Sequence, residues 1–292
     1  MALVAFVAGK LPRTWIMGVA RLQYTHPWIK PTFELIANRI RNRDDVIQQG
    51  VGRGLRFNSG RSIAGYVLGI AEPDIQKAFV ALIKPGMTVY DLGANVGFLS
   101  MIAARLVGPE GQVASFEALP ANARQIAHNA SLNGFTHVTV CECAVGAGDG
   151  QSSFTVSDFA TTGKLSSVKG LHDAARAGEI EVRLRCLDSL VSESNLRTPD
   201  LIKMDVEGAE VDVLTGATDV LTKLRPLLLI ELHGTNEAVS RKLDSLSYTS
   251  CVLGNGARVV DAHWNAHILA VPRERTDLVQ VLHALTTQTL TH

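Results

Sequence analysis

The sequence lacks a surplus of charge of either sign. Its 28 Lys and Arg residues balance its 28 Asp and Glu residues. Nucleic-acid-binding proteins generally need a basic surface that contacts phosphates, so we expect no nucleic-acid partner. Apolar residues make up 46% and charged residues 19% of the 292 residues, which excludes a wholly disordered chain. This length accommodates either one large α/β domain with an extension or two small domains.

Long uncharged apolar runs are also absent. No stretch of 18 residues is free of charged side chains, so we predict no transmembrane helix. The apolar segment at the N-terminus ends at Lys10. Residues 1–24 could form an amphipathic helix that lies on a membrane surface, on the domain or on a second subunit.

The few cysteines do not follow the spacing of a disulfide framework or of a zinc site. They lie in apolar, strand-like segments, and Cys141 and Cys143 share one face of their strand because side chains alternate. We interpret them as buried thiols and predict a reducing, cytoplasmic location. The cysteines are Cys141, Cys143, Cys186 and Cys251.

Short apolar segments alternate with helical patterns from residue 71 onward. A helix that begins at Pro73 has apolar residues at helical spacing, and Pro85 and Gly86 end it. This alternation is typical of βαβ crossovers and of a parallel sheet with helices on both faces. The expected strands are residues 87–91, 112–117, 138–143, 200–204 and 227–232, and the expected helices are residues 97–107, 120–132, 208–222 and 235–246.

Three segments depart from this alternation. Residues 1–60 are rich in Arg, and we expect two or three helices there, followed by a loop or a short hairpin. Residues 145–186 predict an insertion with two strands (SSFTV and EVRLRC), at the sheet edge or over the site. Residues 248–272 predict an antiparallel hairpin, because Asn-Gly separates two apolar runs in SCVLGNGARVV.

These patterns divide the chain into two parts. Residues 1–70 are expected to form a helical extension that serves as a substrate cap or a dimerisation element. Residues 71–292 are expected to form the cofactor-binding domain, with an α/β fold, a mostly parallel sheet and a C-terminal antiparallel hairpin.

The strongest motif, DLGANVG, follows the first expected strand of the domain and precedes an apolar helix. Gly93 and Gly97 permit tight turning and close approach of a ligand. The G-x-G-x-x-G fingerprint of dinucleotide binding is absent, which argues against a nicotinamide cofactor. Asp91 at the start of the loop would disfavour a pyrophosphate, but it suits the positive sulfonium and ammonium groups of S-adenosylmethionine.

An acid also ends the second strand of the domain. Glu117 follows Asp91 by 26 residues. In this architecture a carboxylate at that position binds the ribose hydroxyls of a nucleoside. Taken alone, Asp91 could be a turn residue, and Glu117 could cap the helix that begins at Pro120. Together, on consecutive strands, they predict a nucleoside cofactor.

Further polar side chains lie at the ends of the fourth and fifth strands. Asp205 follows the fourth strand, at the edge where open α/β sheets bind ligands. Glu231 and His233 end the fifth strand, and alternation places both on the same side. Glu207 and Glu210 follow Asp205 in the first turn of a helix, where acids are common capping residues.

Three roles are open for His233. It could be a structural histidine, or a general base that accepts the proton of an attacking hydroxyl. Alternatively, Asp205, Glu231 and His233 could bind a divalent metal that lowers the pKa of this hydroxyl. We do not favour the metal, because Mg²⁺ prefers oxygen ligands. We therefore treat the three residues as candidate catalytic groups and assign no metal ligand.

The ordered motifs resemble the FkbM-type methyltransferase family. The resemblance covers roughly residues 65–235 and rests on DLGANVGFLSMIAARLVGPEGQVASFEALPANARQIAHNASLNG, CAVG, LIKMDVEGAEVDVLTGA and LLLIELHG. The chain has Phe-Glu-Ala where the family commonly has Phe-Glu-Pro. The resemblance implies a Rossmann-like class I methyltransferase fold and S-adenosylmethionine as the methyl donor.

The same resemblance implies roles for individual residues. The glycine loop would wrap the methionine end of the cofactor, and Glu117 would bind the ribose. The end of the third strand would lie beside the adenine, and Asp205 would face the methionine amino group or the substrate. The expected cofactor-binding residues are Asp91, Gly93, Ala94, Asn95, Gly97, Glu117, Ala118, Cys143, Ala144 and Asp205.

The resemblance and the strand-end residues together predict an enzyme that methylates a hydroxyl oxygen. The acceptor class that the family implies is a small molecule or a glycan: a sugar, a glycolipid, a polysaccharide or a secondary metabolite. One alternative is a nitrogen acceptor. Another is a protein that binds S-adenosylmethionine as a partner without turnover, against which the acids and the histidine at the strand ends argue. A homodimer is one role open to the N-terminal extension.

Overall fold

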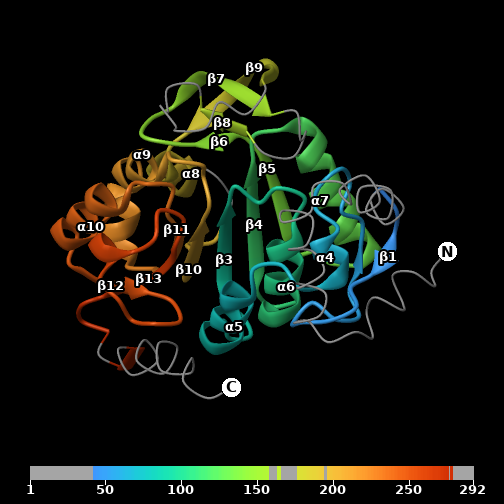
Figure 1. The fold of residues 1–292 in the computed structure, drawn as a ribbon, viewed down its shortest axis with the longest axis horizontal. Coiled ribbons are helices and arrows are strands. Elements are labelled where there is room, and N and C mark those ends of the chain that lie inside the picture. The colour runs from blue at the N-terminus through green and yellow to red at the C-terminus, as the bar shows by residue number, and fades with distance from the viewer. Residues whose placement is uncertain (1–41, 158–162, 166–175, 194–195, 276, 279–292) are drawn as a thin grey trace, which may run out of the picture.

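The strands expected from the sequence form the centre of one sheet (Figure 1). The structure is a computed structural model that describes residues 42–157, 163–165, 176–193, 196–275 and 277–278. Its parallel strands lie in the order β11-β10-β3-β4-β5. With the helices between them they form the Rossmann-like α/β fold that the sequence predicts. The strands are β3 (Thr88–Leu92), β4 (Gln112–Glu117), β5 (Val138–Glu142), β10 (Leu201–Met204) and β11 (Leu227–Glu231).

The strand order reverses at β3. After β3 the chain adds β4 and β5 on one side, and it then crosses back to place β10 and β11 on the other side. The loops that follow β3 and β10 therefore meet: a Cβ atom added to Gly93 would lie 1.8 Å from the carbonyl oxygen of Asp205. Ligands bind at such switch points of open α/β sheets.

Two antiparallel strands complete the sheet beyond β11. β13 (His267–Pro272) pairs with β11, and β12 (Tyr248–Val252) pairs with β13. The sequence predicts this antiparallel pair, but it places the second strand wrongly, directly after the Asn-Gly turn. The turn forms, since the N–H of Gly256 donates to the carbonyl of Val252. The chain then enters a 3₁₀ helix (Val259–Asp261) whose first residue is buried, and it returns to the sheet only at His267.

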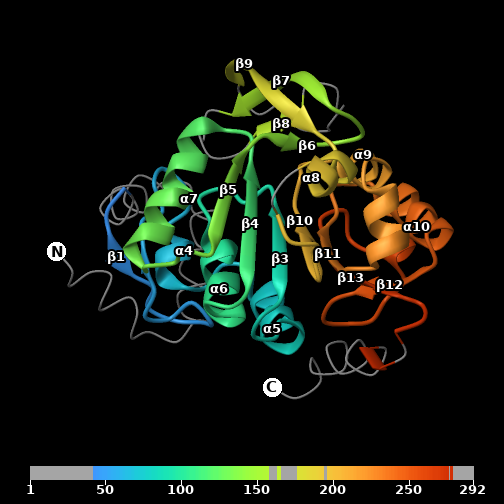
Figure 2. The same cartoon turned by 180° about the vertical axis from the view of Figure 1, so that it is seen from behind.

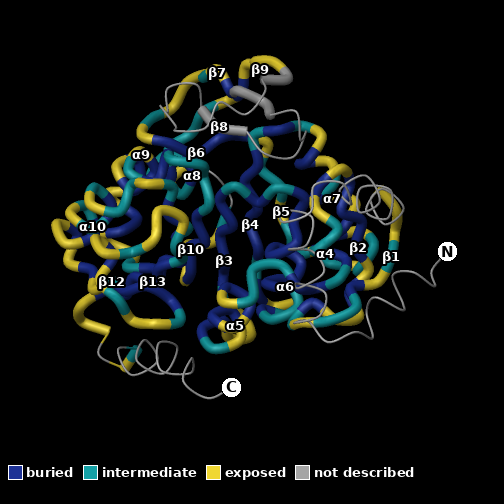
Figure 3. The backbone as a smooth tube through the Cα atoms, viewed as in Figure 1, coloured by how far each residue is buried: buried dark blue, intermediate teal, exposed yellow. Residues whose placement is uncertain are grey.

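Alternation along the strands divides the apolar interior into two cores. Successive strand residues point to opposite faces, so Val89 of β3 belongs to one core and Tyr90 to the other. Figure 3 shows the central strands buried between the outer, more exposed helices. Helices α5 (Pro73–Leu82), α6 (Phe98–Val107) and α7 (Pro120–Leu132) contribute to the first core, and α8 (Leu187–Glu193), α9 (Glu210–Thr215) and α10 (Asn236–Ser245) contribute to the second.

A smaller sheet follows β5. Figures 1 and 2 show it from the front and from behind, above the upper end of the parallel strands. The two strands that the sequence predicts in this insertion correspond to β7 and β9, which pair antiparallel. The sheet has the order β6-β9-β7-β8 and consists of β6 (Ala144–Val145), β7 (Gly150–Ser157), β8 (Gly163–Leu165) and β9 (Arg176–Arg185).

The single helix predicted over residues 208–222 is interrupted. α9 ends at Thr215, and a π-helix follows at Val220–Leu224. Between them, a Cβ atom on Gly216 would lie 2.1 Å from the carbonyl oxygen of Gly146. This close contact with the loop between β6 and β7 of the smaller sheet accompanies the end of α9. Hydrophobic periodicity carries no signal for such a contact.

Residues 42–70 pack against the same core as the sheet. They include the short antiparallel strands β1 (Asp45–Val46) and β2 (Arg56–Phe57) and the helix α4 (Gly65–Leu68). The ring of Tyr66 stacks on Phe98 with their centroids 4.8 Å apart, and Phe57 packs edge-on against both rings. This segment therefore brings Tyr66 next to the helix that follows the glycine loop.

Residues 1–41 lie outside the described residues, and so do the helices and the membrane-contacting segment predicted within them. The proposed cap, dimerisation and membrane roles of this extension stay predictions. Among the described residues, no helix is both long enough and apolar enough to cross a bilayer.

Asn129 of α7 connects the N-terminal segment to the glycine loop. Its buried amide nitrogen donates to the carbonyl oxygens of Asn58 (3.0 Å) and Val96 (2.9 Å), and its amide oxygen accepts the N–H of Asn58 at 2.8 Å. Asn133, one turn further along, makes the same pair of bonds with the backbone of Arg56, at a place that solvent reaches.

We predict that Asn129→Ala lowers the free energy of unfolding by about 2–3 kcal/mol, because it leaves buried backbone groups without partners. Asn133→Ala is the matched control and should cost no more than about 1 kcal/mol, since water can replace its bonds. Denaturant titration of both variants measures the difference. Equal losses in the free energy of unfolding would show that burial does not strengthen the contribution of the Asn129 hydrogen bonds.

Candidate active site

A cavity of about 300 Å³ lies at the carboxyl edge of the sheet. Its wall includes Cys143 after β5, Glu117 of β4, Gly93 after β3, Glu231 of β11 and His267, the first residue of the antiparallel β13. Adjacent strands lie ~4.8 Å apart, so the cavity extends along the row of strand ends. Its volume lies at the lower end of the range for small-molecule sites, roughly 300–1,000 Å³.

Most of the residues predicted for the site line this cavity. They are Gly93, Asn95, Glu117, Ala118, Cys143, Ala144, Asp205, Glu231 and His233. Asp91, Ala94 and Gly97 are not among the residues that line it. The geometry thus brings the predicted cofactor-binding and catalytic residues into one space, while their roles in binding stay predictions.

The glycine loop needs its glycines for different reasons. Gly93 and Gly97 have φ angles of 71° and 83°, which favour glycine. Gly93 has no room for a side chain against Asp205. A Cβ atom on Gly97 would lie 3.2 Å from the side chain of Ile126, so Gly97 lets α6 begin close to α7. Asn95 between them has a φ of 53° and lines the cavity.

Glu117 is held by the backbone of two loops. Its Oε2 atom accepts the N–H of Asn95 at 2.8 Å, and its Oε1 atom accepts the N–H of Leu119 at 2.9 Å. Burial raises the pKa of Glu117 to about 7, although these two hydrogen bonds act in the opposite direction. Each carboxylate oxygen can accept a further hydrogen bond, so the side chain is positioned to receive two hydroxyl groups.

Cys143 and Ala144 form an apolar part of the wall. Both are buried, and the N–H of Cys143 donates to the carbonyl of Cys141 as the strand ends. Burial raises the pKa of the Cys143 thiol to about 12, so the thiol stays protonated. All four cysteines are free thiols: Cys143 and Cys251 are buried, as the sequence predicts, whereas Cys141 and Cys186 are only partly buried.

Asp91 lies behind the cavity in a buried ion pair. Its Oδ1 atom lies 3.2 Å from the ammonium nitrogen of Lys203, and its Oδ2 atom accepts the hydroxyl of Ser100 at 2.6 Å. Lys203 also lies 3.6 Å from Asp205. Although burial opposes the charge of Lys203, the two carboxylates hold its pKa above the ordinary value. Asp91 therefore connects to the site through Lys203.

His233 pairs with Glu210, which the sequence identifies only as a possible cap. The Nδ1 atom of His233 lies 2.9 Å from Oε1 of the fully buried Glu210, whose other oxygen accepts the hydroxyl of Thr235 at 2.7 Å. This leaves Nε2 3.6 Å from carboxylate oxygens of both Asp205 and Glu207. Burial lowers the pKa of His233, but the Glu210 bond and the nearby carboxylates outweigh it and raise the pKa to about 9.

Glu231 pairs with a second histidine. It is the register partner of His267 across β11 and β13, and the Nε2 atom of His267 lies 3.2 Å from its Oε2 atom. Burial lowers the pKa of His267, but the carboxylate of Glu231 outweighs it and raises the pKa. Two carboxylate–histidine pairs, Glu210–His233 and Glu231–His267, therefore lie on the same side of the cavity.

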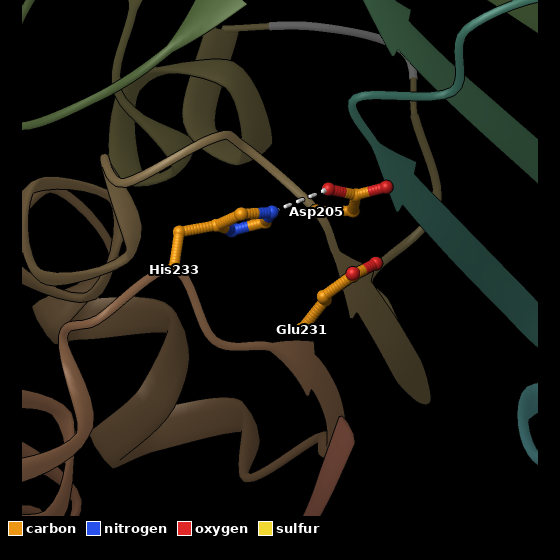
Figure 4. Close-up of side chains that lie close together, drawn as sticks. All are labelled: Asp205, Glu231 and His233. Carbon is orange, nitrogen blue, oxygen red and sulfur yellow. Dashed lines mark ion pairs between the residues drawn. The ribbon is translucent and has the colours of Figure 1, made fainter. Parts of the chain in front are cut away.

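Asp205, Glu231 and His233 converge from two neighbouring strand ends (Figure 4). Each offers one ligand atom, and these atoms all lie within 4.8 Å of one another, so the three residues could hold a metal ion. Each of the three also has a partner of opposite charge or a hydrogen-bonding partner in the protein: Lys203, His267 and Glu210, respectively.

Sequence reasoning missed several cavity residues. Glu72 precedes the helix that begins at Pro73 and has the appearance of a helix cap, but it lines the cavity. Tyr66 and His267 also line it, and neither follows an expected parallel strand. The only available signal was the position of Glu72 next to a helix start; Tyr66 and His267 had none.

Comparison with known proteins gives a family for this arrangement. The chain is 29% identical to the AMB antimetabolite synthetase AmbE of Pseudomonas aeruginosa over 65% of its length, which is 11% of that protein. It is 28% identical to the 2-O-methyltransferase NoeI of Sinorhizobium fredii, over 59% of this chain and 76% of NoeI. It is 24% identical to the hexuronic acid methyltransferase AglP of Haloferax volcanii, over 56% of this chain and 62% of AglP.

The match therefore spans only a small part of the first of these relatives and less than two thirds of the last. A sequence profile of the methyltransferase FkbM domain matches residues 91–260, more than half of the chain. This segment contains the glycine loop, Glu117, Asp205, Glu231 and His233. This match shows that the chain belongs to the FkbM methyltransferase family, and the strand order and the glycine loop at the switch point are consistent with it.

Proposed function

We propose that this protein transfers a methyl group from S-adenosylmethionine to a hydroxyl oxygen of a sugar-like acceptor. The observation that carries the proposal is a single cavity that joins a nucleoside-type half, with the glycine loop and Glu117, to an acid–base half with His233. A binding protein without turnover has no need of a histidine whose Nε2 atom faces Asp205 and Glu207 at 3.6 Å.

The residues of the first half fit the cofactor. Glu117 has two carboxylate oxygens held by backbone N–H groups, in position for the two ribose hydroxyls. Ala118, Cys143 and Ala144 offer an uncharged wall for the adenine. Asp205, on the other side of the loop, offers negative charge to an ammonium or sulfonium group. When bound, S-adenosylmethionine supplies a methyl group that is already activated by the sulfonium.

The protein's part in the reaction is then positioning and proton transfer. Glu210 fixes the ring of His233 through Nδ1, so Nε2 is the atom that accepts the proton of the acceptor hydroxyl as the oxygen attacks. The resulting imidazolium lies beside Asp205 and Glu207, which stabilise its charge. The insertion contributes Phe154 to the cavity wall, which helps to exclude water.

The acceptor class rests on relatives. NoeI is named for 2-O-methylation and AglP for hexuronic acid methylation, so the first name supports an oxygen acceptor and the second a sugar-like one. A hydroxyl acceptor also suits a site that contains a general base. A nitrogen acceptor is the competing proposal, and the position of a transferred label distinguishes the two.

We predict that Glu117→Ala weakens binding of S-adenosylhomocysteine by about 1–3 kcal/mol, because charge-assisted hydrogen bonds to the ribose are lost. Glu142→Ala is the matched control, since Glu142 is the exposed register partner of Glu117 on β5 and should leave affinity unchanged. Isothermal titration calorimetry measures both variants. Undiminished affinity of Glu117→Ala would remove Glu117 from the cofactor site.

With isotopically methyl-labelled S-adenosylmethionine and a set of glycosides, we expect the label on a hydroxyl oxygen, as measured by mass spectrometry and NMR. His233→Ala should lower the rate by about 10²–10⁴-fold, the usual contribution of a general base. Label on nitrogen would favour the alternative acceptor. Binding of the cofactor without any transfer would favour the non-catalytic alternative.

The pH dependence of this rate tests the role of Glu210. His233 has a pKa of about 9, so its neutral, basic form grows as the pH rises, and the rate should rise between about pH 7 and pH 9. Glu210→Gln removes a negative charge, lowers the pKa of His233 and should shift this rise to lower pH. The control Asp212→Asn, an exposed acid in the same helical turn, should leave the profile in place. A profile unmoved by Glu210→Gln would contradict the pairing.

We predict that EDTA leaves the activity intact. Asp205, Glu231 and His233 already have ion-pair partners in Lys203, His267 and Glu210, respectively, and Mg²⁺ prefers a shell of oxygen ligands and water. The measurement is the initial rate after dialysis against EDTA, with and without added Mg²⁺, Mn²⁺ or Zn²⁺. Activity that disappears on chelation and returns with one of these ions would assign a metal to the three residues.

A further inference from the structure

Three cavity residues lie outside the segment that matches the family. Tyr66 and Glu72 precede residue 91, and His267 follows residue 260. His267 contacts Glu231 at 3.2 Å. Besides burial, the negative charges of Asp205 and Glu231 help to raise the pKa of Glu72. Along with burial, those of Glu72 and Asp205 help to raise the pKa of Tyr66. All three residues line the same cavity as Asp205 and Glu231.

The backbone around Glu72 is held in place by buried contacts. Glu72 has a φ of 45°, which is uncommon for a residue with a side chain. The buried side chain of Gln76 donates to the carbonyl oxygens of Ala71 (2.6 Å) and Gly69 (3.3 Å) and accepts the N–H of Val51 at 2.8 Å. Strained positions of this kind persist where the surrounding structure fixes them, and they gather at functional sites.

The carboxylate of Glu72 lacks a partner at one oxygen. Its Oε2 atom is buried and has no hydrogen-bond partner within the described part of the chain. A buried acceptor without a donor is unfavourable, and a ligand in the cavity that carries a hydroxyl group would supply the donor. Burial, together with the like charges of Asp205 and Glu231, raises the pKa of Glu72 to about 7 despite the opposing charge of Lys203.

We propose that Glu72, Tyr66 and the Glu231–His267 pair form the acceptor subsite. The subsite selects an uncharged, hydroxyl-rich acceptor over one with an acidic group next to the reacting hydroxyl. Glu72 accepts a hydrogen bond from the hydroxyl that neighbours the methylated one. An anionic acceptor would bring a further negative charge to Glu72, which, unlike Asp205 and Glu231, has no ion pair among the described residues, and this repulsion discriminates between acceptors. This inference rests on the proposed O-methylation.

The test measures binding, so it does not depend on turnover. NMR titrations of methyl glucoside, methyl galactoside and methyl glucuronide into the S-adenosylhomocysteine complex compare wild type with Glu72→Gln at about pH 8, above the pKa of about 7. Asp74→Asn is the matched control, because this exposed acid lies on the same helix, pairs with Lys77 and does not line the cavity. Thermal unfolding checks that each variant folds.

We expect wild type to bind a neutral glycoside about tenfold more tightly than the uronide. Glu72→Gln should lower the affinity for the neutral glycoside by about tenfold, and it should reduce the difference in affinity between the neutral glycoside and the uronide. Affinity for S-adenosylhomocysteine should change by less than about twofold, and Asp74→Asn should behave as wild type.

Three results of the sugar titrations would overturn the subsite. They are a preference for the uronide, which is a hexuronic acid like the one in the name of AglP; no binding of any of the three sugars; and an unchanged sugar affinity in Glu72→Gln. A loss of about tenfold or more in affinity for S-adenosylhomocysteine would also overturn it, because Glu72 would then bind the ammonium group of the cofactor. Sugars that bind as expected but are never methylated would leave the subsite standing and refute the proposed reaction.

Discussion

The buried ion pair between Lys203 and Asp91 is the interaction on which the site depends. The two residues are register partners on β10 and β3. The ammonium of Lys203 lies 3.2 Å from Asp91 and 3.6 Å from Asp205, and it donates to the carbonyl of Gly93 at 3.3 Å. One charge thus holds two strand ends, the glycine loop and Asp205 together. An unpaired buried charge is strongly unfavourable, so these groups stay together in the folded protein.

The site extends in both directions from this point along the row of strand ends. Toward β5 it offers backbone-held Glu117 and an apolar wall, and toward β13 it offers acids and histidines. The segment that matches the family supplies Glu117, Asp205, Glu231 and His233, whereas the chain on either side of it adds Tyr66, Glu72 and His267. On the proposed function, the matching segment would keep the cofactor site while flanking residues alter the acceptor subsite.

The sequence predicts the part of this arrangement that local rules control. Parallel strands read as short apolar runs between helices, and strands β3, β4, β5, β10 and β11 form within a residue or two of their expected bounds. The carboxyl ends of such strands share one edge, so Gly93, Glu117, Asp205 and His233 could be placed in one site before their distances were known. The strand-end acids predicted a nucleoside cofactor, and the resemblance to a family implied S-adenosylmethionine.

By itself, then, the sequence determined the parallel strands and the glycine loop, because a strand's period and a glycine's backbone freedom are local properties, whereas the order of the strands and the switch point came from the structure. Only the tertiary structure decided the partners. Glu231 ends β11 and His233 lies only two residues further on, yet Glu231 pairs with His267 and His233 pairs with Glu210. Side-chain alternation predicts which way a residue points, but not which residue it contacts. Glu72 reaches the cavity for the same reason, through contacts between segments that are distant in the chain.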